Sequence, residues 1–126
     1  MTVFYVVYPA QNSVSNLWTY REGTMSAGND VIGYDVEAID GSIGKIDGTT
    51  NETDNAHVVV DTGWWIFGKK RLIPAGAITS ADHENEKVAV QLTKDQIKAA
   101  PDFDESVSLD TSNRGVYDDY YGPFGW

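Results

Sequence analysis

The chain has 126 residues, no cysteine and a formal net charge of −10 at pH 7. Its length suits one domain with a hydrophobic core, and the missing cysteines exclude disulfides, thiolate nucleophiles and cysteine-ligated zinc. The negative charge repels phosphate backbones, so no direct nucleic-acid partner is expected, and without a run of about 20 apolar residues we expect a cytoplasmic protein with no membrane insertion.

Residues 1–27 are predicted to be an N-terminal extension with one possible strand. The run Val3–Tyr8 contains only β-branched and aromatic residues, which is typical of a strand that pairs with a sheet edge of its own chain or of a partner. A polar stretch rich in Ser and Asn follows it. Two interpretations stay open, an added strand that mediates dimerisation and a mobile extension. Met25 is a further candidate for the natural start.

Residues 28–104 carry a regular pattern of short strands and turns. Strands are predicted over 31–39, 43–48, 56–61, 70–74, 77–81 and 87–92, and glycines should bend the second of them. Thr93 and Gln96 fit a capping box for a short helix over 94–100. The pattern predicts a mainly β fold, a small, strongly curved β-barrel of about six short strands with one short C-terminal helix.

Residues 105–126 form an acidic tail that is rich in tyrosine. An acidic composition alone would suit a disordered segment. The density of aromatic rings over 117–126 favours instead a segment that docks on its own barrel or on a partner subunit.

The stretch 63–74 places aromatic rings beside a basic cluster in an otherwise acidic chain. Trp and Arg dominate the energetics of protein interfaces. We therefore expect a protein-interaction site in which three apolar anchors precede three residues of a charged rim: Trp64, Trp65, Phe67, Lys69, Lys70 and Arg71. The alternative is that the rings close the corner of a barrel and belong to its core. Residues 63–69 are called the aromatic loop below.

Other chemistry has little support in the sequence. Gly63–Lys69 matches the spacing of a phosphate-binding loop, but Lys70 stands where Ser or Thr should ligate magnesium. His57 and His83 lack metal-ligand spacing. Segment 51–55 is rich in oxygen ligands but lacks the order of a calcium loop, which leaves weak calcium binding open. We predict no catalytic, cofactor or metal site, and hence no enzyme.

The order of motifs resembles the PRC-barrel family over residues 31–103. The resemblance rests on these stretches in order: Val31–Val36, Asp40–Ile46, Ala56–Gly63, the tryptophans of the aromatic loop, Lys69–Pro74, Val88–Val90 and Leu92–Phe103. It implies a small, strongly curved barrel that acts as a non-catalytic interaction module. The family includes the cytoplasmic barrel of the photosynthetic reaction-centre H subunit. It also includes the C-terminal domain of the ribosome maturation factor, which binds a small-subunit protein.

The function expected from the residues and the resemblance is a self-associating interaction module. Its partners would be a second copy, in a homodimer, and an unidentified protein. The alternative is an accessory factor that binds a ribosomal or other RNA-metabolism protein, by analogy with the maturation factor. A small-molecule carrier with the aromatic loop as a lid is a third possibility, supported by the aromatic cluster alone.

Overall fold

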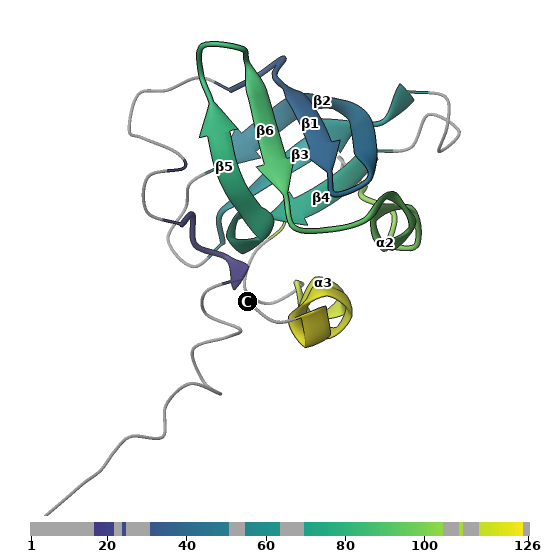
Figure 1. Cartoon of the computed structure of the whole chain (residues 1–126). Helices are drawn as coiled ribbons and strands as arrows, with labels where there is room; N and C mark the ends of the chain where they lie inside the picture. The colour runs from purple at the N-terminus through teal and green to yellow at the C-terminus, as the bar shows by residue number, and fades with distance from the viewer. Residues whose placement is uncertain are drawn as a thin grey trace, which may run out of the picture.

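A computed structural model describes residues 17–21, 24, 31–50, 55–63, 70–104, 109 and 114–124. One mixed sheet of six strands has the order β4-β3-β2-β1-β6-β5 (Figure 1). The strands are β1 (Asp35–Ala38), β2 (Gly41–Thr50), β3 (His57–Asp61), β4 (Lys70–Pro74), β5 (Ile78–Asp82) and β6 (Lys87–Val90). The remaining elements are η2 (Ala75–Ala77), α2 (Lys94–Lys98), α3 (Gly115–Tyr121) and η3 (Gly122–Phe124).

The prediction of a mainly β fold is confirmed. Neighbouring strands are antiparallel, except that β1 and β6 are parallel. Within the described ranges β4 and β5 are the two edges of the sheet. The sheet is therefore not closed, and the expected strongly curved barrel is not confirmed.

Strand β2 bends because one glycine allows two backbones to approach closely. The strand pairs with β1 up to Lys45 and with β3 from Lys45 onward. Gly44, at this change of partner, has a φ of +149°, and a Cβ there would clash with the carbonyl group of Asp61. Only glycine adopts this conformation without a steric cost, so the predicted glycine bend of the second strand is confirmed.

The hydrophobic core joins the sheet to segments on both sides of residues 28–104. Strand residues such as Val36, Ile46 and Val58 are buried in it. Leu17 and Trp18 precede the sheet and are fully buried, and Tyr117 and Tyr121 of α3 belong to the same cluster. Each such side chain contributes about 1.5–3 kcal/mol through burial. The N-terminal and C-terminal segments therefore complete the core.

The predicted capping box is present at the start of α2. The Gln96 N–H donates to the hydroxyl oxygen of Thr93 at 3.1 Å, and the Thr93 N–H donates to the Gln96 side chain at 2.8 Å. The carboxylate of Asp40 accepts a further bond from the Lys94 N–H at 2.8 Å. These contacts satisfy amide groups that have no partner inside a helix. The helix is two residues shorter than predicted and ends at Lys98.

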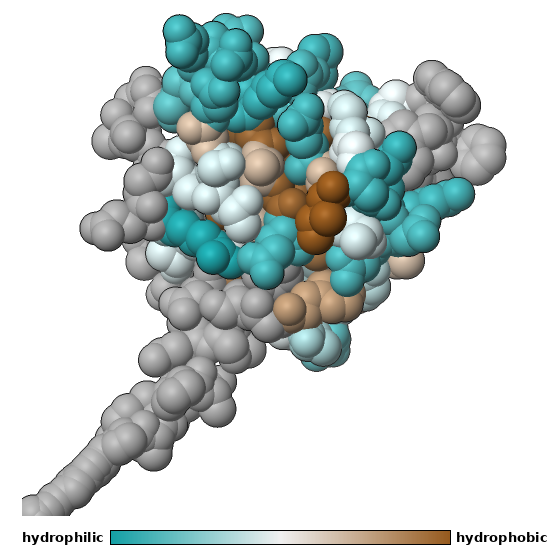
Figure 2. Space-filling view, in the orientation of Figure 1, coloured by the Kyte–Doolittle hydropathy of each residue, from teal (hydrophilic) through white to brown (hydrophobic). Residues whose placement is uncertain are grey.

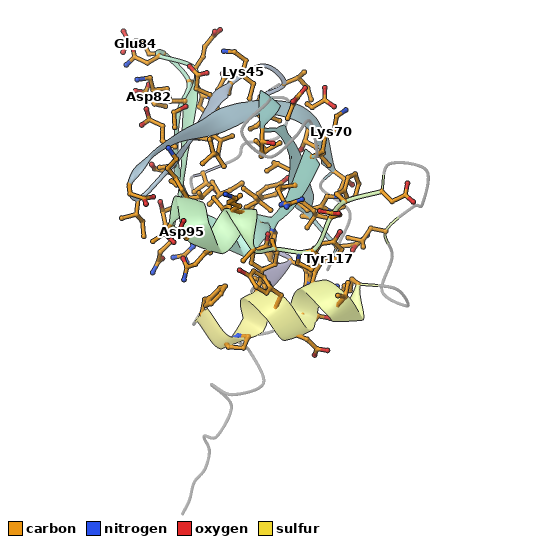
Figure 3. All side chains as sticks on the ribbon, turned by 90° about the vertical axis from the view of Figure 1, so that its right-hand side faces the viewer. Lys45, Lys70, Asp82, Glu84, Asp95 and Tyr117 are labelled. Carbon is orange, nitrogen blue, oxygen red and sulfur yellow. The ribbon has the colours of Figure 1, made fainter. Side chains whose placement is uncertain are left out.

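Helix α3 docks on the chain's own fold, below the sheet in Figures 1 and 3. Three of its tyrosines donate their hydroxyls to backbone carbonyls. Tyr117 bonds to Asp102 at 3.2 Å, Tyr120 to Gln96 at 2.5 Å and Tyr121 to Leu72 at 2.7 Å. The aromatic tail is thus attached to β4, to α2 and to the segment that follows α2.

The described surface is largely polar. Figure 2 shows hydrophilic residues around a smaller hydrophobic area over the middle of the sheet. Among the described residues, the large apolar side chains that are exposed are Ile32, Ile39 and Val116. None of the helices in the described ranges has the length and apolar character needed to span a bilayer.

Candidate protein-interaction surface

A row of alternately basic and acidic side chains crosses all six strands. The register places each residue directly opposite the next, and directly opposed residues of a sheet point to the same face. From β4 to β5 this charged row is Lys70, Asp61, Lys45, Asp35, Lys87 and Asp82. Figure 3 shows Lys70, Lys45 and Asp82 along the upper side of the fold, opposite α3.

The charged row has no net charge and lies in contact with water. Lys45 forms an ion pair with Asp35 at 2.8 Å, although the two side chains are 66% and 42% exposed. Lys70 pairs with Asp47 at 2.5 Å, and Lys87 lies 3.6 Å from Glu37. Exposed pairs contribute about 0–1 kcal/mol each because solvent and salt screen them. They also favour this strand register over a shifted one, which would move these opposite charges apart.

The β5–β6 hairpin ends the charged row with an acidic turn. Asp82 accepts bonds from the side chain of Asn85 at 2.8 Å and from the N–H groups of Asn85 and Glu84 at 3.1 Å. These bonds, those of Asn85 first, hold the pKa of Asp82 below its ordinary value, and Lys87 adds to the effect. The carboxylate therefore stays charged and keeps the turn in shape.

The aromatic loop connects β3 to β4 at the opposite end of the charged row from this hairpin. Strand β3 ends at Asp61 and β4 begins opposite it at Lys70. The Asp61 carboxylate accepts the Gly63 N–H at 2.9 Å, and Gly63 has a φ of +65°. This local turn ends the pairing of β3 where the loop begins.

Four of the six predicted interaction residues lie outside the described residues: Trp64, Trp65, Phe67 and Lys69. The same holds for Val3–Tyr8, Met25 and residues 51–54 of the candidate calcium segment. Lys70 is the first residue of β4, and its side chain is 26% exposed and paired to Asp47.

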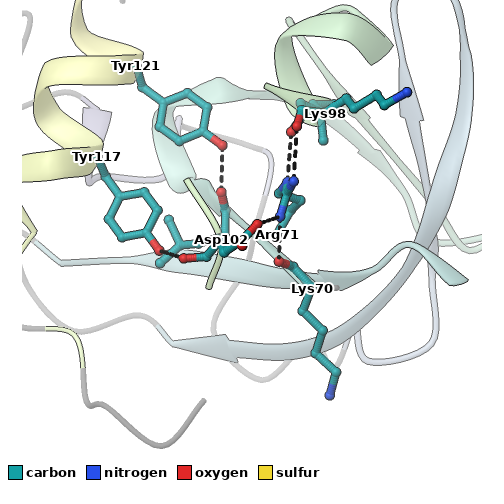
Figure 4. A network of polar contacts seen from close by, with 8 residues as sticks. Lys70, Arg71, Lys98, Asp102, Tyr117 and Tyr121 are labelled. Atoms are coloured by element: carbon teal, nitrogen blue, oxygen red, sulfur yellow. Dashed lines mark hydrogen bonds and ion pairs between the residues drawn. The ribbon is translucent and has the colours of Figure 1, made fainter. Parts of the chain in front are cut away.

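Arg71, expected at the charged rim, is instead buried, with 4% of its surface exposed. Its guanidinium donates to the carbonyls of Ile97 and Lys98 at 3.0 Å and to the Asp102 carboxylate at 2.7 Å (Figure 4). Successive side chains of a strand point to opposite faces. Adjacent basic residues in β4 therefore separate, with Lys70 on the outer face and Arg71 inside.

The contacts of Arg71 form a structural network that the sequence did not reveal. The planar guanidinium can bond several oxygens at once, and here it satisfies carbonyls at the end of α2. Tyr117 bonds to the backbone carbonyl of Asp102, which pairs with this arginine, and Tyr121 bonds to that of Leu72, the residue after it (Figure 4). One buried arginine thus links β4, α2 and the segment that follows α2.

Both histidines have partners within the fold. His57 is buried, its Nδ1 lies 2.9 Å from the Asn55 carbonyl oxygen, and its ring packs edge-on against Trp18. His83 has its Nδ1 3.1 Å from the Tyr34 hydroxyl. Among the described residues no three His, Asp or Glu side chains gather as metal ligands would.

No protein-family model matches the chain, and no curated protein matches it. One solved structure to which it is similar is RimM of Pseudomonas aeruginosa, described as a 16S ribosomal RNA processing protein. The identity is 23% and the TM-score 0.43, over 52% of this chain and 42% of that chain. The chain thus spans less than half the length of RimM. A similarity at this level carries no argument, and the resemblance to the PRC-barrel family stays a prediction.

Proposed function

We propose that the protein is a non-catalytic interaction module of the PRC-barrel type, which self-associates and binds protein through its aromatic loop. The observation that carries the proposal is the anchoring of that loop between two paired strand ends. Asp61 and Lys70 face each other in the ladder that joins β3 and β4. Loops held by a rigid scaffold are where proteins most often place binding residues.

The composition of the loop supports binding to protein. Trp64, Trp65 and Phe67 offer large rigid rings, the kind of side chain that anchors interfaces. The charged row runs from the base of the loop across the sheet and would supply the polar rim that surrounds an apolar interface centre. Lys69 and Lys70 are the rim residues nearest the rings in sequence.

The chemistry of the described residues supports a role without catalysis. Catalytic groups carry pKa values shifted by burial and by neighbouring charges in a cleft. Here the pKa values raised by burial belong to hydroxyls that serve as structural donors, such as those of Tyr117 and Tyr121. The carboxylates of the charged row face lysines on an exposed surface.

A second candidate function is an accessory role beside a ribosomal or other RNA-metabolism protein in the cytoplasm. The net charge of −10 favours it, because an acidic surface steers basic partners into contact. Co-sedimentation with ribosomal subunits at low salt would support this role, and a protein that stays in the supernatant under those conditions would contradict it.

The proposed function is tested by the molar mass in solution. Light scattering over a dilution series would compare the full chain with Trp64→Ala and Trp65→Ala. Val116→Ala is the matched control, because Val116 is an apolar residue that is 53% exposed and belongs to α3, not to the loop. Circular dichroism would report whether each variant is folded.

We expect both tryptophan variants to stay folded and to dissociate at higher concentrations than the control. Unfolding of both would assign the rings to the core and overturn the site. Folded variants with unchanged mass would exclude the loop from self-association, and the module would then bind itself through another surface.

A further inference from the structure

The two edges of the sheet differ in how the chain covers them. At the β4 edge the Lys70 carbonyl accepts the Phe103 N–H at 3.4 Å, and the Leu72 carbonyl accepts the Tyr121 hydroxyl at 2.7 Å. Pro74, in the same strand, has no N–H to offer. This edge is therefore blocked by the C-terminal half of the chain, as natural sheets commonly block an edge against further pairing.

At the β5 edge, the peptide groups of Ala81 have no hydrogen-bond partner among the described residues. The Asp35 N–H bonds to the Glu86 carbonyl, so the peptide groups of the even-numbered residues of β6 point towards β1. The peptide groups of the odd-numbered Lys87 and Ala89 therefore point towards β5, where their register partners are Asp82 and Ser80. Because peptide groups alternate in direction along a strand, the N–H and C=O of Ala81 point away from β6.

Among the residues that the structure describes, none bonds to the backbone of this edge. In the described ranges the backbone of residues 79–82 has no hydrogen-bond partner outside the β5–β6 ladder. The side chains of Thr79, Ser80 and Asp82 are exposed and that of Ala81 is partly exposed. A bulge between Ile78 and Ser80 twists the start of the strand, so an added strand would centre on Ala81.

We propose that the segment Val3–Tyr8 of a second copy of this chain pairs with the β5 edge around Ala81. This inference rests on the proposed self-association. The segment has six uncharged β-branched and aromatic residues and ends at Pro9, which suits a strand of about the length of β5. Backbone bonds to Ala81 supply the affinity, as in other cases of strand addition.

The tether between the segment and the core allows this exchange. Residues 9–16 connect Val3–Tyr8 to Leu17, which is fully buried. Eight residues reach up to about 28 Å when extended, enough for the segment to extend to a neighbouring molecule. In a two-fold dimer each copy would give its segment and receive one, so the contact closes without forming a fibre.

The test uses proline substitutions in the full chain. Ala81→Pro removes the outward N–H and breaks no bond to β6, and Val6→Pro removes an N–H from the middle of the segment. Ala81→Ser and Val6→Thr are the matched controls, because each keeps its N–H. Truncation to Met25 is unsuitable, since it removes the buried Leu17 and Trp18.

Light scattering should show a dimer for the full chain and for both controls. We expect each proline variant to raise the dimer dissociation constant at least about tenfold, and hydrogen exchange at Ala81 to be slow in the dimer and fast in Val6→Pro. A Val6→Pro variant that dimerises normally would overturn the inference, whether or not Ala81→Pro folds. A monomer in which exchange at Ala81 is slow would also overturn it, because the edge would then be covered within one chain.

The outcomes separate this inference from the proposed function. Loss of the dimer in Trp64→Ala, with normal dimers in both proline variants, would keep the interaction loop and reject the strand exchange. A full chain that is monomeric at every concentration would reject self-association and the strand exchange together, and would leave the loop as a site for another protein.

Discussion

The indole N–H of Trp18 donates to the carboxylate of Asp118 at 2.6 Å, although the two residues are 100 positions apart. The Trp18 ring is fully buried and packs edge-on against Tyr117. Arg114 lies 5.3 Å from the centre of the same ring and 3.5 Å from the Asp118 carboxylate. The segments that precede and follow the sheet in the sequence therefore bond to each other and also pack in the core.

Removing this contact should destabilise the fold by more than the loss of one exposed ion pair. We expect Trp18→Phe and Asp118→Asn each to lower the free energy of unfolding by about 1–3 kcal/mol. Trp18→Phe removes the donor, and Asp118→Asn removes the charge that strengthens this bond and pairs with Arg114. Urea denaturation would measure the single variants and the double variant. The double variant should cost less than the sum of the two. The control is Asp119→Asn on the exposed side of α3, and a loss there equal to that of Asp118→Asn would contradict the prediction.

Arg71 should be essential to the stability of the fold. Arg71→Met removes the donors from two carbonyls and leaves Asp102 without its ion pair, so we expect a loss of about 2–4 kcal/mol. Arg71→Lys should recover only part of it, since an ammonium group cannot bond the same oxygens as a planar fork. The control is Lys98→Gln, because Lys98 contacts Arg71 only through its backbone carbonyl in the network described. Chemical denaturation would measure the losses. If the arginine variants lost no more unfolding free energy than Lys98→Gln, the structural role of Arg71 would be contradicted.

Charge reversal in the charged row should cost more than neutralisation. Asp35 lies between Lys45 and Lys87 on neighbouring strands. Asp35→Asn should lower the free energy of unfolding by less than about 1 kcal/mol, and Asp35→Lys by more, since it places like charges directly opposite each other. The difference should shrink in high salt, because salt screens exposed charges. Denaturation at low and high salt would measure it, and Glu84→Gln at the hairpin tip is the control. Equal losses for the two Asp35 variants would contradict a role for charge.

The fold should unfold in alkali as its tyrosines ionise. Burial raises the pKa values of the hydroxyls of Tyr20, Tyr117, Tyr120 and Tyr121. The unfolded chain loses these protons at about pH 10, before the folded chain does. Their contribution is therefore complete below about pH 10 and is lost as the pH rises through the folded pKa values.

Tyrosinate absorbance and far-ultraviolet circular dichroism, followed together in a pH titration, would check this. We expect ionisation and unfolding to occur in one cooperative step above about pH 10, and Tyr121→Phe to make the dependence on pH less steep. Gradual ionisation of all tyrosines near their ordinary pKa, with the fold intact, would contradict the prediction.

Local patterns in the sequence were sufficient for several features of the structure. Thr93 and Gln96 predicted the capping box because the bonds of a helix cap join residues only three positions apart. The glycine bend of β2 was predictable because Gly44 and Gly48 interrupt an alternating pattern. The strands themselves followed from runs of β-branched residues and turn signals.

The position of Arg71 could not be derived in the same way. The run Lys69-Lys70-Arg71 is one basic cluster in the sequence, and strand alternation alone does not say which residue points inward. That choice depends on carbonyls at the end of α2, which reach Arg71 only after the sheet has formed. The burial of Trp18 likewise depends on Asp118 at the other end of the chain.

The mainly β class, the six strands and the short capped helix could be derived from the sequence alone, because these features depend on residues that are close together along the chain. Three features of the described residues could not be derived in this way. Opposite charges align across six strands, the β4 edge is covered while the β5 edge has no described partner, and the aromatic tail docks on its own fold. These features depend on strand register and on contacts between distant segments. Such contacts form only when loop closure and burial favour one arrangement of the whole chain.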